Sequence, residues 1–188
     1  MRSTRTPVGR LSASAKRIGG PLLFGKIWER LGIGDVLSEL LKDRCFEFAV
    51  ERAVLVATLH RVFVSGSDRD CSSWMKDYDI AGAQGFGLHH FYRAMAWLGE
   101  VDASGRSTAE AIEDALYRHR QPLLGEVSIA FFDTTTLWFE GAGGESLGQR
   151  GHSKDYRGHL KQVALGIVLD GEDRLIASFL CCRATLRM

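Results

Sequence analysis

The sequence predicts an α+β protein, in which a helical N-terminal region precedes antiparallel strands. Apolar residues recur at helical spacing as far as Pro122, whereas β-branched and aromatic residues gather in short runs after it. Asp170-Gly171 separates two of these runs and indicates a tight turn, because glycine tolerates positive φ. We therefore expect a flexible basic arm over 1–20, a helical domain over 21–122 and a strand-rich domain that starts at 123 and includes the remaining residues to 188.

Five helices are expected, and the strongest pattern lies in the middle of the helical region. Over 46–64 the polar residues form one narrow stripe and almost everything else is apolar, so this helix should be the centre of a small bundle. Ser107 followed by Glu110 is a capping-box arrangement and predicts a helix start, and Pro122 predicts its end. The expected helices are 22–31, 34–42, 46–64, 87–98 and 107–122.

Three strands are expected after Pro122, over 127–139, 162–169 and 174–180. Their order and the short turn between the last two predict an antiparallel meander. The first strand is apolar on both faces, so we expect it to lie centrally in the sheet with helices packed on it.

Composition argues against a membrane-spanning, secreted, zinc-binding or disulfide-bonded protein. No run of about 18 apolar residues exists and no secretory signal is visible, so we expect a cytoplasmic protein without a membrane span. The four cysteines lack zinc-ligand spacing, and we expect neither a structural metal nor a disulfide.

Basic residues are clustered although the net charge is only +1. The first 20 residues carry five cations and no acid, and a second cluster comprises Arg150, Lys154, Arg157 and Lys161. Such clusters suit phosphate contacts, but a solvated tail and a solvated loop fit them equally. The helical region likewise fits either a DNA-binding domain or an ordinary packing domain.

Asp133 is the residue most indicative of chemistry. It lies within FFDTTTLWF, which otherwise reads as a buried strand, and carboxylates are seldom buried unless they are paired or hold a metal. The acid therefore indicates a site at an edge or opening of the sheet, or a bound cation. The alternative is an aspartate at a strand end that caps a local turn through the threonines that follow.

Three spaced elements resemble the start of the catalytic core in the IS-four-like group of DDE transposases. They are Asp133-Thr134-Thr135-Thr136, Gly151-His152-Ser153-Lys154-Asp155 and Leu160-Lys161-Gln162. The resemblance covers roughly 127–178 closely, and the preceding helical region agrees chiefly in layout.

The resemblance implies an RNase H-like fold and an Asp-Asp-Glu triad, with Asp133 as the first catalytic and metal-binding member. Two Mg²⁺ ions about 4 Å apart then activate the attacking oxygen and stabilise the leaving one during DNA cleavage and strand transfer. Lys154, Arg157 and Lys161 would contact DNA phosphates, and the partners would be terminal inverted repeats and a second subunit.

The sequence departs from the family after the third strand. The second and third triad carboxylates are expected from a later strand and helix, whereas here 181–188 read CCRATLRM, as after a shifted reading frame. The RNase H-like core is therefore expected to be incomplete. Three readings stay open: a catalytically incomplete transposase, a fragment that only binds element ends or inhibits the full-length enzyme, and a remnant whose open sheet edge favours aggregation.

Overall fold

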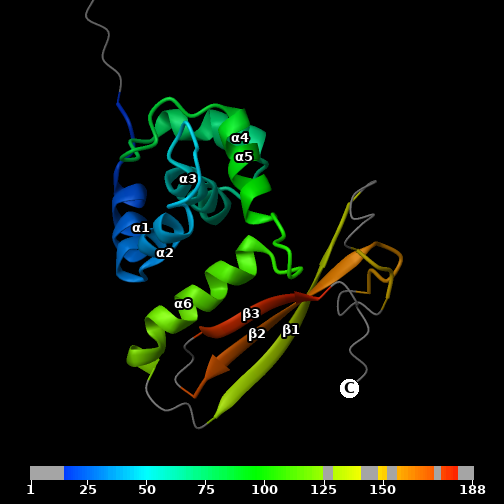
Figure 1. Cartoon of the computed structure of the whole chain (residues 1–188). Coiled ribbons are helices and arrows are strands. Elements are labelled where there is room, and N and C mark those ends of the chain that lie inside the picture. The colour runs from blue at the N-terminus through cyan, green and yellow to red at the C-terminus, as the bar shows by residue number, and fades with distance from the viewer. Residues whose placement is uncertain (1–14, 125–128, 141–147, 152–155, 172–174, 182–188) are drawn as a thin grey trace, which may run out of the picture. The chain divides into compact units, whose positions relative to one another are not determined.

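The computed structural model describes residues 15–124, 129–140, 148–151, 156–171 and 175–181, with backbone alone for 121–124 and 175–181. Helices come first and an antiparallel sheet follows, which confirms the α+β class (Figure 1). None of the helices in this part of the chain is long and apolar enough to cross a membrane. The elements are α1 (Gly19–Arg30), α2 (Ile33–Leu40), α3 (Val50–Phe63), α4 (Asp68–Trp74), the 3₁₀ helix η1 (Met75–Asp77), α5 (Leu88–Leu98), α6 (Thr108–Leu124), β1 (Ala130–Trp138), β2 (Gln162–Asp170) and β3 (Leu175–Cys181).

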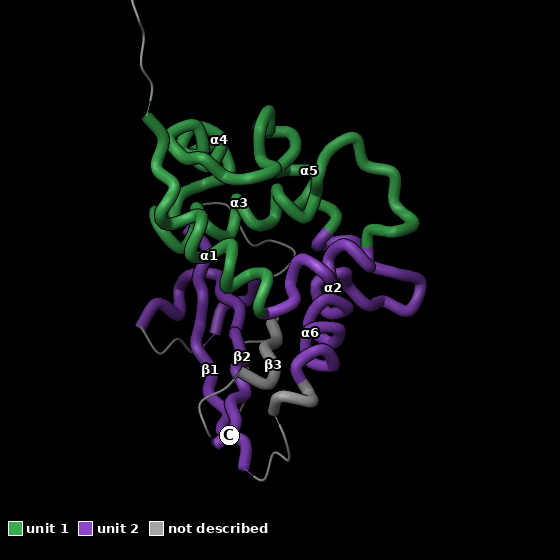
Figure 2. Tube along the Cα trace, turned by 90° about the vertical axis from the view of Figure 1, so that its left-hand side faces the viewer, with its two compact units in different colours: residues 1–30, 41–97 green, residues 31–40, 98–188 purple. Residues whose placement is uncertain are grey.

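The chain divides into two compact units, shown in different colours in Figure 2. Unit 1 comprises residues 1–30 and 41–97, and unit 2 comprises 31–40 and 98–188. α2 and α6 thus group with the strands, since α6 contacts both α2 and β3. The domain boundaries expected from the sequence stay a prediction.

α3 is the core helix of unit 1, as its narrow polar stripe predicts. Eight of its residues are buried, and the helix contacts α1 and α4. Residues of the polar stripe bind the neighbouring helices. Glu51 Oε1 accepts a hydrogen bond from Trp28 Nε1 of α1 at 2.6 Å, and Arg61 forms an ion pair with Asp68 of α4 at 3.0 Å. The helix begins at Val50, so the aromatic segment before it is not helical.

The link between α1 and α2 requires glycine at one position. Gly32 has φ +69°, and a Cβ there would clash with the His119 ring of α6. The gap expected between the helices over 22–31 and 34–42 falls at this glycine. Gly34 lies within α2 and does not interrupt it.

The strands form a three-stranded antiparallel meander in the order β1-β2-β3. Among the described strands β2 is therefore central and β1 is an edge strand, so the expected central position of β1 is wrong. Large apolar side chains remain exposed on both faces of this segment: Ile129, Phe131, Phe132 and Leu137. Apolar side chains on both faces show that a strand favours burial, but they do not show which strands cover it.

Two further differences from the sequence expectation concern α4 and the end of α6. α4 and η1 were not expected, although Ser67 and Asp70 form a complete capping box at the start of α4. α6 continues through Pro122 to Leu124. The helix thus ends two residues later than predicted, which is within the usual variation of helix boundaries.

The capping box at the start of α6 is confirmed. The backbone N–H of Glu110 donates to Ser107 Oγ at 3.2 Å, and that of Ser107 donates to Glu110 Oε2 at 2.6 Å. The backbone and side-chain hydrogen bonds from Ser107 lower the pKa of Glu110 below its usual 4.5. A lowered pKa means that the folded state holds the charged carboxylate preferentially.

We predict that Ser107→Ala lowers the free energy of unfolding by about 1 kcal/mol near neutral pH. The difference from wild type should shrink as the pH falls below 4.5, because Glu110 becomes protonated and the hydrogen bond that Ser107 Oγ donates to its Oε2 at 2.9 Å, which alanine cannot make, weakens. Urea denaturation at several pH values measures this, with the exposed Ser73→Ala on α4 as control. A difference that stays constant down to pH 2 would contradict it.

Candidate functional site

Asp133 lies near the middle of β1, and its side chain is exposed. The β1–β2 register places it opposite Ile167. Its Oδ1 accepts a hydrogen bond from the Thr134 N–H at 2.8 Å. The strand continues for five residues beyond it, so the alternative of a turn-capping aspartate at a strand end is wrong. The position agrees with an acid at an accessible edge of the sheet.

The sheet face that carries Asp133 holds no other acid among the described residues of β1 and β2. Because side chains alternate along a strand, Asp133 shares this face with Phe131, Thr135 and Leu137 of β1, and with Leu165, Ile167 and Leu169 of β2. Asp170 faces Ala130 and lies on the opposite face, where it is buried. Asp170 therefore cannot join Asp133 in holding a cation, and Glu172 and Asp173 lie outside the described residues.

The donor chemistry at Asp133 suits a hard cation, but the number of donors is small. An exposed carboxylate oxygen is the ligand type that Mg²⁺ prefers, and Mg²⁺ retains several water ligands. In the described part of the chain, no three His, Cys, Asp or Glu side chains group as a metal site. Asp133 can thus contribute to a cation site that further ligands complete.

The basic residues between β1 and β2 lie at the end of the strand pair where β1 ends and β2 begins. The Arg157 guanidinium lies 4.5 Å from the centroid of the Trp138 ring and 3.6 Å from Glu140 Oε1. Lys161 directly precedes β2, and its carbonyl accepts a hydrogen bond from the Phe139 N–H at 2.8 Å. Lys154 lies outside the described residues.

Arg157 packs on a residue of the strand that carries Asp133, but Arg157 and Asp133 do not form one cluster. Trp138 follows Asp133 by five residues, which corresponds to roughly 17 Å along an extended strand. The Trp138 ring orients Arg157, while Glu140 is largely exposed, so this ion pair contributes little to stability and Arg157 can exchange it for a phosphate.

Charge is distributed unequally between the two units. Unit 1 has 14 Lys and Arg against 8 Asp and Glu, whereas unit 2 has 10 against 15. The net charges are thus +6 and −5, which together give the overall +1. The positive net charge of unit 1 has the sign that attracts nucleic acid.

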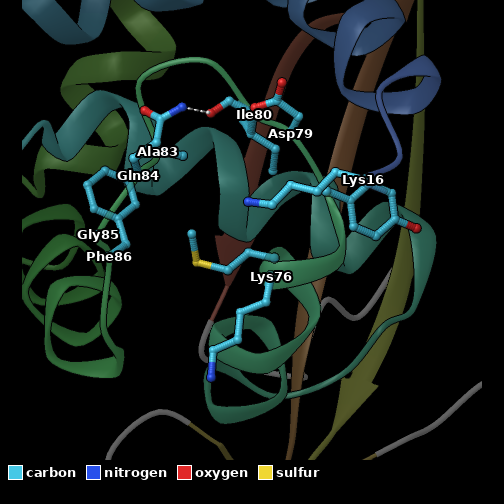
Figure 3. Close-up of a pocket in the computed structure, with 10 residues that line it drawn as sticks. Lys16, Lys76, Asp79, Ile80, Ala83, Gln84, Gly85 and Phe86 are labelled. Atoms are coloured by element: carbon cyan, nitrogen blue, oxygen red, sulfur yellow. Dashed lines mark hydrogen bonds between the residues drawn. The ribbon is translucent and has the colours of Figure 1, made fainter. Parts of the chain in front are cut away.

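A half-open pocket of ≈290 Å³ lies in unit 1 and contains two lysines (Figure 3). Lys16 extends toward its middle, with Asp79 and Ile80 on one side and Lys76 on the other. The last part of the expected arm is held here, since Arg17 pairs with Tyr78 as a β-bridge and its guanidinium lies 5.7 Å from that ring. The Lys76 Nζ points away from the Lys16 Nζ (Figure 3), so Lys16, beside Asp79, is the lysine that an anion entering this pocket would meet.

Sequence reasoning missed this pocket. Lys16 is 60 residues from Lys76, and neither has a motif around it. The basic composition of the arm indicated a phosphate contact, but only the bridge from Arg17 to Tyr78 brings the arm to η1.

Comparisons with known proteins do not assign the chain to a family. The chain matches no protein-family model, and searches of curated proteins and of solved structures find no match either.

We predict that Asp133→Asn changes the free energy of unfolding by less than about 0.5 kcal/mol, because the side chain is exposed and its strand is at the sheet edge. Chemical denaturation of the full chain measures this, with the buried Phe91→Ala as a destabilised reference. A loss above 1 kcal/mol would show that Asp133 has a structural role.

Proposed function

We propose that the chain provides the DNA-binding helices and the first catalytic aspartate of a DDE-type transposase, and that Asp133 holds Mg²⁺ while DNA is cleaved and transferred. The observation that carries the proposal is an exposed aspartate in the first strand of an antiparallel meander that follows a helical region. The resemblance of the Asp-Thr-Thr, Gly-His-Ser-Lys-Asp and Leu-Lys-Gln elements supports it, and the RNase H-like identity of the sheet is part of the proposal.

Each candidate residue has one role in this proposal. Asp133 offers carboxylate oxygens to the cation, and a bound divalent ion activates a phosphodiester toward displacement. Arg157, oriented by Trp138, and Lys161 contact the DNA backbone some distance from the reacting bond. We assign Lys154 to the same contact from its place in the sequence.

The chain alone is proposed to be catalytically incomplete. Asp133 is the one acid on its sheet face among the described residues of β1 and β2, and a single carboxylate holds Mg²⁺ weakly. Carboxylates from beyond the described residues or from another polypeptide would have to complete the site.

A fragment that only binds DNA is the second candidate, and the net charge of +6 on unit 1 favours it. In this case Lys16 and Lys76 make the principal phosphate contacts, and the chain occupies element ends without cleaving them. The two candidates differ in whether the β1–β2 loop contributes to binding.

DNA binding by the full chain tests both candidates. Fluorescence anisotropy with a duplex that carries the inverted repeat flanking the gene, and with a scrambled duplex, is measured over a salt series. We expect combined Lys154→Ala, Arg157→Ala and Lys161→Ala to weaken binding and to reduce the slope of log affinity against log salt by about 2 to 3. If the helical unit makes the principal contact, the combined Lys16→Ala and Lys76→Ala substitutions should instead weaken binding and reduce the salt slope.

Arg118→Ala on α6 is the matched control, because it removes an exposed cation that is ion-paired with Asp114. No binding to either duplex at low salt would contradict both candidates and favour a non-functional remnant. Mg²⁺-dependent cleavage by the purified chain, lost in Asp133→Ala, would contradict catalytic incompleteness while supporting the role of Asp133.

A further inference from the structure

The pocket beside η1 in unit 1 combines one inward cation with an apolar wall. The Lys16 side chain extends toward its middle, whereas the Lys76 ammonium points away from that of Lys16 (Figure 3). Within the described part of the chain the Lys16 ammonium has neither a hydrogen-bond nor an ion-pair partner. The buried side chains of Ile80 and Ala83 line the same pocket. A ligand that fits these residues carries an anionic group on an otherwise apolar body.

One wall of the pocket is an aromatic ring that its neighbours hold in place. Phe86 is half-buried, and its ring centroid lies 6.1, 5.6 and 6.2 Å from those of Phe48, His90 and Phe91. These contacts fix the ring, and the rest of its surface lines the pocket. Nucleobases stack on aromatic side chains because every base is planar and has a π face. The apolar body of the ligand is therefore best matched by a planar base.

Two further side chains offer oxygen acceptors at the pocket. The Asp79 carboxylate has no hydrogen-bond or ion-pair partner in the described part of the chain. Gln84 Nε2 donates to the Ile80 carbonyl at 3.4 Å, which leaves the Gln84 carbonyl oxygen as an acceptor. The exocyclic amino groups of cytosine, adenine and guanine donate hydrogen bonds, whereas thymine and its analogue uracil present a carbonyl oxygen instead. A carboxylate acceptor thus favours bases that carry an amino group.

We propose that this pocket binds a nucleoside monophosphate whose base carries an amino group. The phosphate lies at Lys16, the base stacks on Phe86, and the amino group donates to Asp79. The pocket volume of ≈290 Å³ is at the lower limit of ligand pockets, so it holds one nucleotide and not a length of strand. The inference goes beyond the transposase proposal, because it depends on neither Asp133 nor the β1–β2 loop.

Isothermal titration calorimetry of the full chain with dCMP and dUMP tests the base contact, because these two nucleotides differ only in the edge of the base that includes position 4. We expect dCMP to bind about tenfold more tightly than dUMP. Asp79→Asn should remove most of this preference, since a carboxamide can both donate and accept. Equal affinities of the unmodified chain for the two nucleotides would overturn the contact between the amino group and Asp79.

Lys76→Ala is the matched control for the phosphate contact, because Lys76 lines the same pocket but points away. Lys16→Ala should weaken dCMP binding by about tenfold and leave deoxycytidine binding unchanged, whereas Lys76→Ala should change neither by more than about twofold. Phe86→Leu should weaken dCMP and deoxycytidine alike, by about fivefold. Urea denaturation shows whether Phe86→Leu keeps the fold. Lys16 and Asp79 are exposed, so their variants test the proposal independently of Phe86.

A free nucleotide and the unpaired end of a DNA strand present the same chemistry, and competition separates these sources. Displacement of a fluorescent duplex with an unpaired terminal cytosine by dCMP would support the pocket with a strand end as its ligand. Saturable dCMP binding without displacement would support it with a free nucleotide. No saturable dCMP binding at millimolar concentration, equal losses from Lys16→Ala and Lys76→Ala, or inorganic phosphate binding as tightly as dCMP would overturn the proposal. None of these results bears on Asp133, so the transposase proposal stands or fails separately.

Discussion

The antiparallel register of β1 and β2 is the constraint on which the candidate chemistry depends. It places Asp133 opposite Ile167 on a sheet face whose other described residues in β1 and β2 are uncharged, while Asp170 is turned to the other face. A shift of the strand pairing by one residue would move Asp133 to the opposite face of the sheet. The same register holds Trp138, and therefore Arg157, at the far end of the strand from Asp133.

Local sequence signals predicted most of the elements. The capping box at Ser107, the narrow polar stripe of α3 and the turn glycine after Asp170 each act within a few residues, and helices or strands occur where they indicated. The helix at Asp68 was missed because its capping box precedes a segment too short to show an apolar periodicity. Pro122 was overinterpreted as the end of the helix, since α6 continues for two residues beyond it.

Non-local relations were not predictable in the same way. Apolarity on both faces of β1 indicated burial, yet strand order decides which strand is central, and here it is β2. Lys16 and Lys76 line one pocket because a bridge joins the arm to Tyr78. Asp133 could be singled out because an acid in an apolar strand is unusual locally. That no second acid shares its face within the described residues of β1 and β2 could be seen only from the register.

The central claim, that Asp133 is a ligand of a divalent cation, is tested most directly by Fe²⁺-directed backbone cleavage. Fe²⁺ bound in place of Mg²⁺ generates hydroxyl radicals with ascorbate and peroxide, and mass spectrometry locates the cuts. We expect cuts within 131–135 and within 165–169 of the adjacent strand, suppressed by excess Mg²⁺ and absent in Asp133→Asn. Cuts that persist in Asp133→Asn, or that occur only elsewhere in the chain, would contradict the account.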